Sequence, residues 1–290
     1  MKKVITVIIL LNVIGNQLSA QEALNNTFYA FNNCVRTLPG APEMLDDQIK
    51  LINELGYDGI AGHHSQDNLV LLKALEKAGL EMPEVYWPVK LLDSGDVSYD
   101  GSIHEIIKKA SDKDLLVTLV LSTDKYMNHP EQGDPLFAKG LQELADYAAK
   151  YNAKIAVYPH VNNYCETVEH TLGLVKMIDR ANAGVVFNLC HFLKVEGAAG
   201  WQVKVKEALP YIYMVSINGA DEGNTQEMDW DQLIQPLGEG SFNTFEVVKF
   251  LKDHGYKEKF GLQCYNIDQD CELVLRKSME TWEQYQEKMD

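Results

Sequence analysis

The stretch Ala183–Gly197, AGVVFNLCHFLKVEG, decides the fold prediction. It contains an apolar run at 185–187, which is typical of a strand buried on both faces. Asn188, Cys190 and His191 follow directly. In parallel α/β folds, functional sites are built at the C-terminal ends of the strands. This stretch alone fits either such a site or a buried strand that ends in an ordinary polar turn, so the rest of the chain has to decide.

The flanking sequence repeats one unit, a strand-like block followed by a helix-like block. The predicted strands are 28–33, 57–61, 82–89, 115–121, 154–157, 185–187, 211–215 and 260–262. The predicted helices are 42–55, 68–78, 102–110, 136–150, 167–178, 201–209, 245–253 and 271–285. The connection 122–135 is long and polar, and we expect it to be a binding loop or lid.

Eight such units without a composition break predict an α/β fold, a single (β/α)8 TIM barrel over residues 21–290. The alternative is a doubly wound open sheet, which usually carries a glycine-rich phosphate turn after its first strand. The first predicted strand here ends in NNCVRTLPG, which contains no GxGxxG. We therefore favour the barrel.

The N-terminus, MKKVITVIILLNVIGNQLSAQ, has the pattern of a secretory signal peptide over residues 1–20. Two lysines precede a short apolar core, and small residues precede Gln21. The apolar core is too short for a stable membrane span. We expect the protein to be exported, to the periplasm or beyond the cell.

The charge of the chain is strongly negative. Removal of residues 1–20 takes away Lys2 and Lys3 and no acidic residue, so the formal net charge goes from −16 to −18. Such a protein is a poor partner for nucleic acid or an anionic membrane surface. No apolar run after the leader is long enough to span a membrane, so we expect neither nucleic acid nor a membrane span among its partners.

The chain contains five cysteines in no CxxC pattern, so the sequence predicts neither a disulfide framework nor a zinc ribbon. A single disulfide remains an alternative in an oxidising compartment. We favour buried thiols that pack as small apolar groups.

Polar side chains follow nearly every predicted strand. In a barrel these positions converge on one mouth. They are rich in amides, imidazoles and phenols, which both donate and accept hydrogen bonds and so suit a neutral carbohydrate. Trp87 and the tyrosines are candidates to stack on a sugar face. The candidate residues are Asn32, His63, His64, Lys90, Tyr158, His160, Asn188, His191, Asn218, Asp221, Gln263 and Tyr265.

A series of motifs in this order resembles the xylose isomerase-like TIM barrels, the sugar phosphate isomerase/epimerase group. The motifs are YPHVNNYCETVEHTLGLVKMID, GVVFNLCHFLKVEG, VSINGAD, IQPLGEGSF and FGLQCY, from Tyr158 to Tyr265. The resemblance implies a TIM barrel that acts on a small sugar, in a secreted branch of the group.

Active members of this family hold a divalent metal with Glu, Asp, His and Glu after strands five to eight. The resemblance places Tyr158, Asn188, Ser216 and Gln263 at these positions. None of the four is a carboxylate or an imidazole, and amides offer a hard cation only neutral oxygens. We therefore expect no metal cofactor, and we do not carry the metal-assisted proton transfer of the family over to this chain.

Two weaker metal hypotheses remain open. His160 and His191 could share an ion, together with Asp221, and the pair His63 and His64 could supply one ligand.

The leading hypothesis is a carbohydrate enzyme that works without a metal ion. Its reaction would be isomerisation, epimerisation, or elimination and hydration on a keto-sugar. His160 and His191 are the acid/base candidates, because imidazole titrates near neutral pH. Tyr158 is the third catalytic candidate, as a proton donor to oxygen. The remaining candidates would bind substrate hydroxyls.

Three alternatives stay open. One is a non-catalytic carbohydrate-binding barrel, and another is a partner-binding barrel with a vestigial mouth. A glycoside hydrolase needs a pair of carboxylates, for which the sequence offers only Asp221 and Glu239 near the mouth.

Overall fold

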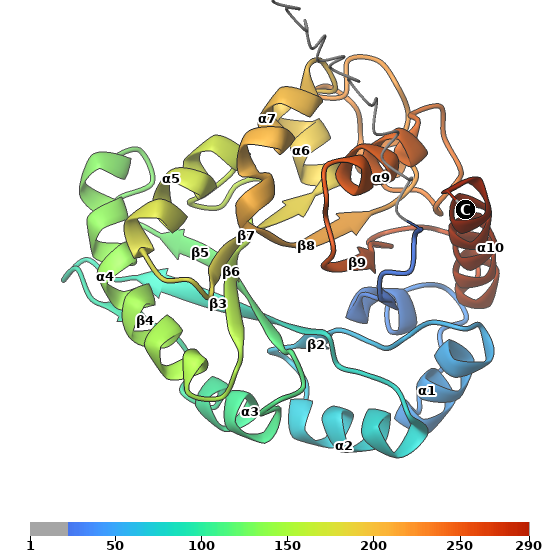
Figure 1. Cartoon of the computed structure of the whole chain (residues 1–290), viewed down its shortest axis with the longest axis horizontal. Coiled ribbons are helices and arrows are strands. Elements are labelled where there is room, and N and C mark those ends of the chain that lie inside the picture. The colour runs from blue at the N-terminus through green and yellow to red at the C-terminus, as the bar shows by residue number, and fades with distance from the viewer. Residues whose placement is uncertain (1–22, 290) are drawn as a thin grey trace, which may run out of the picture.

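The computed structural model describes residues 23–289, and the predicted signal peptide at 1–20 lies outside this part. A ring of parallel strands forms the centre of the described chain, and helices surround it (Figure 1). The strand order is β1-β9-β8-β7-β6-β5-β3-β2. The backbones of Ala30 and Ile60 pair in parallel, so the end of β1 lies beside the segment that leads into β2. This pairing closes the ring of strands. The predicted (β/α)8 barrel is therefore confirmed.

The barrel strands are β1 (Phe28–Ala30), β2 (Gly62–His63), β3 (Glu84–Leu91), β5 (Leu116–Thr123), β6 (Lys154–Val157), β7 (Ala183–Asn188), β8 (Ile212–Ile217) and β9 (Lys259–Leu262). A short strand, β4 (Val97–Ser98), pairs antiparallel with the end of β3.

The α-helices are α1 (Leu45–Glu54), α2 (Asn68–Ala78), α3 (Ile103–Lys109), α4 (Pro130–Ala149), α5 (Val168–Ile178), α6 (Leu189–Glu196), α7 (Trp201–Ala208), α8 (Trp230–Leu233), α9 (Thr244–Asp253) and α10 (Cys271–Met289). Two 3-10 turns, η1 (Asn32–Val35) and η2 (Leu209–Tyr211), complete the described elements.

The stretch 183–197 folds as a strand that passes directly into a helix. Every residue of β7 is buried, as the apolar run predicts. Asn188 ends the strand and caps α6, because its Oδ1 accepts a hydrogen bond from the backbone N–H of His191 at 3.0 Å. Cys190 and His191 therefore lie in the first turn of a helix at the C-terminal end of the strand. Of the two readings of this stretch, the structure supports the strand end that carries polar side chains into the barrel mouth.

The connection after β5 is shorter than the sequence indicates. Helix α4 begins at Pro130, inside the predicted loop 122–135, and includes Pro135. Pro130 is tolerated as the first residue of the helix, because the N–H that it lacks would have no partner there. Pro135 lies inside the helix, beyond its first turn. The prediction of a long loop was wrong from Pro130 onward, and His129 lies just before the helix.

The five cysteines all lie in the described part of the chain, and there each is buried with a free thiol. The structure thus agrees with the interpretation that they pack as apolar groups. No helix within residues 23–289 combines the length and apolarity needed to cross a bilayer.

Candidate functional site

A cavity of about 750 Å³ opens at the C-terminal ends of the barrel strands. Its walls come from the ends of β1, β2, β6, β7 and β9, from the first residues of β3 and from the segment around Trp230. We call it the mouth cavity. Seven of the predicted site residues line it: Asn32, His63, Tyr158, His160, His191, Gln263 and Tyr265.

The other five predicted residues do not line the mouth cavity. Asn188 is buried directly behind it and hydrogen-bonds to Tyr158. His64 packs beside His63, with ring centroids 4.4 Å apart. Lys90 is exposed and pairs with Asp124 at 2.7 Å, because β3 extends past the barrel into its hairpin with β4.

Asn218 and Asp221 organise the loop after β8. Asn218 Nδ2 donates to the carbonyl oxygen of Leu233 at 2.7 Å. Asp221 accepts from the backbone N–H of Ser241 at 3.1 Å and from Nε2 of Gln235 at 3.0 Å. Nδ2 of Asn218 and the carboxylate of Asp221 thus hold the loop in place, whereas Oδ1 of Asn218 is buried without a hydrogen-bond partner among the described residues. Neither residue lines the mouth cavity, so the structure does not bring Asp221 beside the histidines.

His160 and His191 meet inside the mouth cavity. Their ring centroids are 3.9 Å apart. Nδ1 of His160 lies 2.8 Å from the carbonyl oxygen of Val161. A carbonyl oxygen only accepts hydrogen bonds, so the proton of a neutral His160 ring is on Nδ1 and the lone pair is on Nε2. The His160 ring therefore has a basic nitrogen that its own backbone does not use.

Both imidazoles are held in the neutral form. Burial lowers the pKa of His160 below its usual value, although the Val161 carbonyl and Glu166 oppose this. Burial lowers the pKa of His191 further, and a charge on His160 would add to that effect. Nδ1 of His191 is buried without a hydrogen-bond partner in the described protein. A buried nitrogen without a hydrogen-bond partner destabilises the folded protein unless a ligand or a water molecule bonds to it.

The four side chains that the sequence resemblance placed at the metal-ligand positions meet around one phenol. Nδ2 of Asn188 donates to Oη of Tyr158 and to Oγ of Ser216, each at 2.5 Å. The amide of Gln263 also hydrogen-bonds to Tyr158. Burial raises the pKa of Tyr158 well above its usual value, so this hydroxyl keeps its proton. We call Tyr158, Asn188, Ser216 and Gln263 the neutral network.

The orientation of both amides is fixed by backbone N–H groups. Oδ1 of Asn188 accepts from the N–H of His191, and Oε1 of Gln263 accepts from the N–H of Tyr265 at 3.0 Å. A backbone N–H can only donate, so each amide oxygen must face it. The NH₂ groups therefore point to Tyr158, and the neutral network directs donors to the place where a cation would need acceptors.

Glu84 is a residue of the mouth cavity that the sequence reasoning missed. It is buried in the floor, where Oγ1 of Thr118 donates to its Oε2 at 2.7 Å. Burial raises its pKa to about 7, opposed by hydrogen bonds from hydroxyl groups and by the charge of Lys259. The predicted site residues all follow strands, whereas Glu84 begins its strand. Its signal was a carboxylate two residues before Tyr86, which puts both on the inner face of β3.

The aromatic wall also differs from the prediction. Trp87 is 2% exposed and does not line the mouth cavity, so it cannot stack on a ligand there. Side chains alternate along a strand, and because the neighbouring Tyr86 faces the cavity, Trp87 points to the other side of β3. The tyrosines Tyr86 and Tyr265 line the mouth cavity as predicted, and Trp230 lines it in place of Trp87. Trp230 packs edge-to-face on His191, with ring centroids 5.4 Å apart.

Within the described residues, no three His, Cys, Asp or Glu side chains lie close enough together to hold a metal ion. The mouth cavity instead combines amides, phenols, a pair of imidazoles, the exposed Arg36 and the buried carboxyl of Glu84. Such an arrangement can bind hydroxyl groups and can move protons through His160, His191 and Glu84.

A model of the xylose isomerase-like TIM barrel family matches residues 49–285. Comparison with curated proteins gives no significant match.

Solved structures of low sequence identity share the fold. The IOLI protein, solved with a bound zinc atom, has a TM-score of 0.70 and 17% identity over 91% of this chain and 99% of its own. An L-ribulose 3-epimerase has a TM-score of 0.66 and 15% identity, with coverage of 91% and 95%. The D-psicose 3-epimerase of Clostridium cellulolyticum H10, solved with D-tagatose, has a TM-score of 0.67 and 12% identity, with coverage of 91% and 99%.

Proposed function

The chain belongs to the xylose isomerase-like TIM barrel family, and from that membership and the geometry of the mouth we propose that it is an exported sugar isomerase or epimerase that works without a metal ion. The substrate is a neutral sugar or keto-sugar. Solved barrels of similar fold include epimerases of L-ribulose and D-psicose. The observation that carries the proposal is the neutral pair of imidazoles, His160 and His191, beside the protonated phenol of Tyr158.

The base of the proposed reaction is Nε2 of His160. It takes a proton from the carbon next to the carbonyl group of the sugar. The electrons of that C–H bond form a carbon–carbon double bond, and the π electrons of the carbonyl group move to its oxygen, which gives an enediolate. For isomerisation, the protonated His160 returns the proton to the former carbonyl carbon, while the neighbouring hydroxyl group passes its proton to the charged oxygen and becomes the new carbonyl group. For epimerisation, a donor on the opposite face of the substrate protonates the original carbon, and the carbonyl group forms again. A low pKa keeps His160 ready to accept a proton at neutral pH, although it also makes the base weaker.

Other groups of the mouth cavity hold the substrate and supply protons. Tyr158 keeps its proton and can donate a hydrogen bond to the oxygen on which negative charge develops. Glu84, with a pKa near 7, is half protonated at neutral pH and can exchange a proton with the substrate from the floor of the cavity. Asn32 and Gln263 provide amides for sugar hydroxyls.

We propose a reaction without a metal ion because of the atoms that the neutral network presents. Oxygen ligands suit hard divalent cations, and carboxylates bind them best. In the neutral network both amide oxygens are occupied by backbone N–H groups. A cation at Tyr158 would face N–H donors, so the four residues do not fit a metal ion.

The test is deuterium exchange. The mature protein is incubated in D₂O with a panel of ketoses and aldoses, after treatment with a chelator, and the sugars are analysed by NMR and mass spectrometry. We expect deuterium to enter the carbon next to the carbonyl group, and we expect His160→Ala to lower the exchange rate by about 100-fold or more. The matched control is His104→Ala, a half-buried histidine on α3 that does not line the mouth cavity. Full exchange by His160→Ala or His191→Ala would contradict the proposal.

A second candidate function is a carbohydrate-binding barrel without catalysis. The neutral network favours this alternative, because it contains amides in place of the carboxylates that move protons in active family members. The cavity of about 750 Å³ would still be able to bind a sugar. Calorimetric binding of a sugar with no deuterium exchange would support this alternative over the enzyme.

A further inference from the structure

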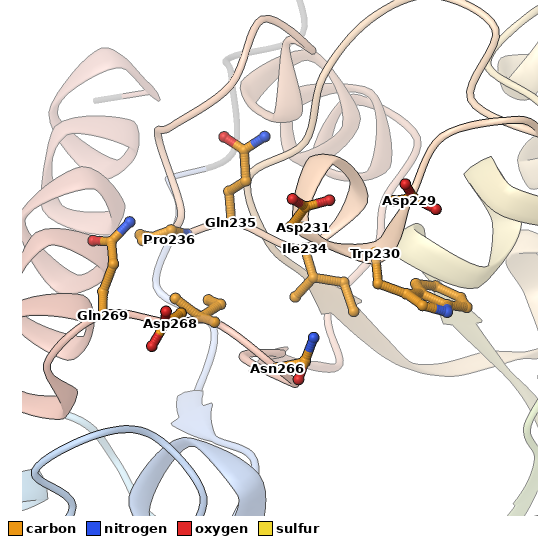
Figure 2. A pocket seen from close by; sticks show the side chains of 10 residues that line it. Asp229, Trp230, Asp231, Ile234, Gln235, Pro236, Asn266, Asp268 and Gln269 are labelled. Carbon is orange, nitrogen blue, oxygen red and sulfur yellow. The ribbon is translucent and has the colours of Figure 1, made fainter.

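A second cavity of about 620 Å³ lies beside the mouth. Figure 2 shows that its walls come from the segment 229–236 on one side and the turn 266–269 on the other. We call it the side cavity. Trp230 and Ile234 line both the side cavity and the mouth cavity. The two hollows therefore adjoin across these two side chains.

The shared wall has a fixed position. Trp230 is the first residue of α8, and Asp229 forms a capping box with Gln232 at the start of that helix. Just beyond the helix, the backbones of Gly219 and Gln235 exchange hydrogen bonds of 2.9 and 2.8 Å. Gly219 has no room for a side chain, because a Cβ there would lie 2.2 Å from the carbonyl oxygen of Pro236. The segment that carries Trp230 is thus tied to the barrel by backbone contacts.

The opposite wall also passes from one cavity to the other. Tyr265, which is 56% exposed, lines the mouth cavity, and its neighbour Asn266 lines the side cavity. Asn266 has a left-handed backbone, with φ of 61°, which turns the chain sharply at this point. In Figure 2, Ile234 and Asn266 point into the same space. A ligand that leaves the mouth past Trp230 and Tyr265 would therefore enter the side cavity directly.

The side cavity offers hydrogen-bond acceptors and an apolar face. Asp231 and Asp268 are exposed carboxylates at its edge, and Asn266 adds an exposed amide. Carboxylates accept hydrogen bonds from hydroxyl groups and repel anions. Trp230 and Ile234 supply the apolar contacts on which the face of a sugar ring can rest. These groups match a neutral ring with several hydroxyl groups.

We propose that the side cavity is a second subsite, and that the ligand is a neutral disaccharide with one ring in the mouth and the other beside Asp231 and Asp268. This inference rests on the proposed function, because it takes the mouth as the place where the first sugar ring binds. Ligand pockets in proteins commonly have about 300–1,000 Å³ for a drug-sized molecule. The mouth cavity alone, at about 750 Å³, is already generous for a single hexose, and the side cavity extends it.

The experiment is titration calorimetry on the mature protein with glucose and fructose against maltose, cellobiose and sucrose. We expect at least one disaccharide to bind about tenfold more tightly than either monosaccharide, and a disaccharide with a glucuronic acid as its second ring to bind more weakly than its neutral counterpart. Asp268→Ala should lower the ratio of disaccharide to monosaccharide affinity by about threefold or more. The control, Glu207→Ala, changes an exposed acid on the outer helix α7 and should leave that ratio unchanged.

The outcomes separate the two proposals. Monosaccharide binding without any gain for the disaccharides, or an affinity ratio that Asp268→Ala does not alter, would overturn the second subsite and leave the proposed function standing. If neither class of sugar binds, the proposed function fails and the second subsite fails with it. Trp230→Phe keeps an aromatic ring in the shared wall, whereas Trp230→Ala removes it. Trp230→Phe should therefore retain more disaccharide affinity than Trp230→Ala. This comparison checks that the affinity depends on contact between the sugar and the aromatic side chain.

Discussion

Glu84 shows how the environment of one residue changes its chemistry. Glu84 is 2% exposed in the floor of the mouth cavity, and its carboxyl group accepts a hydrogen bond from the neutral hydroxyl of Thr118. The positive charge of Lys259 acts on it too weakly to offset burial, so the pKa rises to about 7. A carboxylic acid with such a pKa can both give and take a proton at neutral pH.

The raised pKa of Glu84 predicts a loss of stability with rising pH. Between pH 4.5 and 7 the folded protein keeps a proton on Glu84 that the unfolded chain has lost, so folding becomes less favourable across this window. The shift corresponds to about 3 kcal/mol of unfolding free energy, fully lost above pH 7. Glu84→Gln cannot ionise, so its stability should fall less between pH 5 and pH 8 than that of the natural protein.

Urea unfolding at pH 5 and pH 8 measures this difference. Glu81→Gln, an exposed acid three residues earlier, is the control and should follow the natural protein. If the natural protein and Glu84→Gln lose the same free energy between the two pH values, Glu84 is ionised in the folded state and the account of the cavity floor is wrong.

At the scale of elements, helices α4 and α5 are joined by a buried polar cluster. Asp134 of α4 is 7% exposed and accepts a hydrogen bond from Oη of Tyr164 at 2.7 Å. The same oxygen, Oδ1, lies 3.0 Å from Nε2 of His170 on α5. The cluster fixes the start of α4 against the segment that follows β6, which is also the segment that carries His160 into the mouth cavity.

Removal of the carboxyl group should destabilise the protein. Asp134→Ala leaves the buried hydroxyl of Tyr164 without its acceptor, which should cost about 2–3 kcal/mol of unfolding free energy. Asp146→Ala on the same helix breaks the exposed pair with Arg180 and should cost clearly less unfolding free energy, because solvent screens the charges of an exposed ion pair. Urea midpoints of the two variants compare them directly, and equal losses would show that the cluster is not a special contact between the helices.

The bounds of elements could be predicted where local signals were strong. Helix α2 and strand β6 have the predicted bounds. The Asp67 cap and Gly79, in a left-handed conformation, mark both ends of α2. Strand β2 was predicted at 57–61 but lies at Gly62–His63. Its position is decided by where its backbone begins to pair with the neighbouring strand β3. No pattern in the sequence encodes that register.

Over the whole molecule, the sequence predicted the barrel and part of its site. Strand ends converge in this fold, so seven of twelve candidate residues line one cavity. Lys90 failed to reach the cavity because β3 runs on into its hairpin with β4, which the sequence did not predict. The sequence did not predict Trp230 because this residue begins the short helix α8, well beyond the end of β8, and only the tertiary fold brings it back to His191.

The charge of the whole molecule favours a neutral ligand. The formal net charge is −16, and the side cavity adds carboxylates next to the mouth. Of the groups that line the mouth cavity in the described chain, Arg36 carries the one permanent positive charge, and it already hydrogen-bonds to Asn32. A sugar phosphate would therefore find a repulsive field with a single cation to offset it.

The central claim is that the neutral network takes the place of a metal centre and that the mouth works on its sugar directly. The most direct measurement is the metal content of the purified mature protein by elemental analysis, with sugar binding and deuterium exchange measured before and after chelation. The account predicts far less than one divalent ion per chain and no loss of either activity on chelation. A stoichiometric divalent ion that disappears in Asn188→Ala or Gln263→Ala, together with the activity, would contradict it.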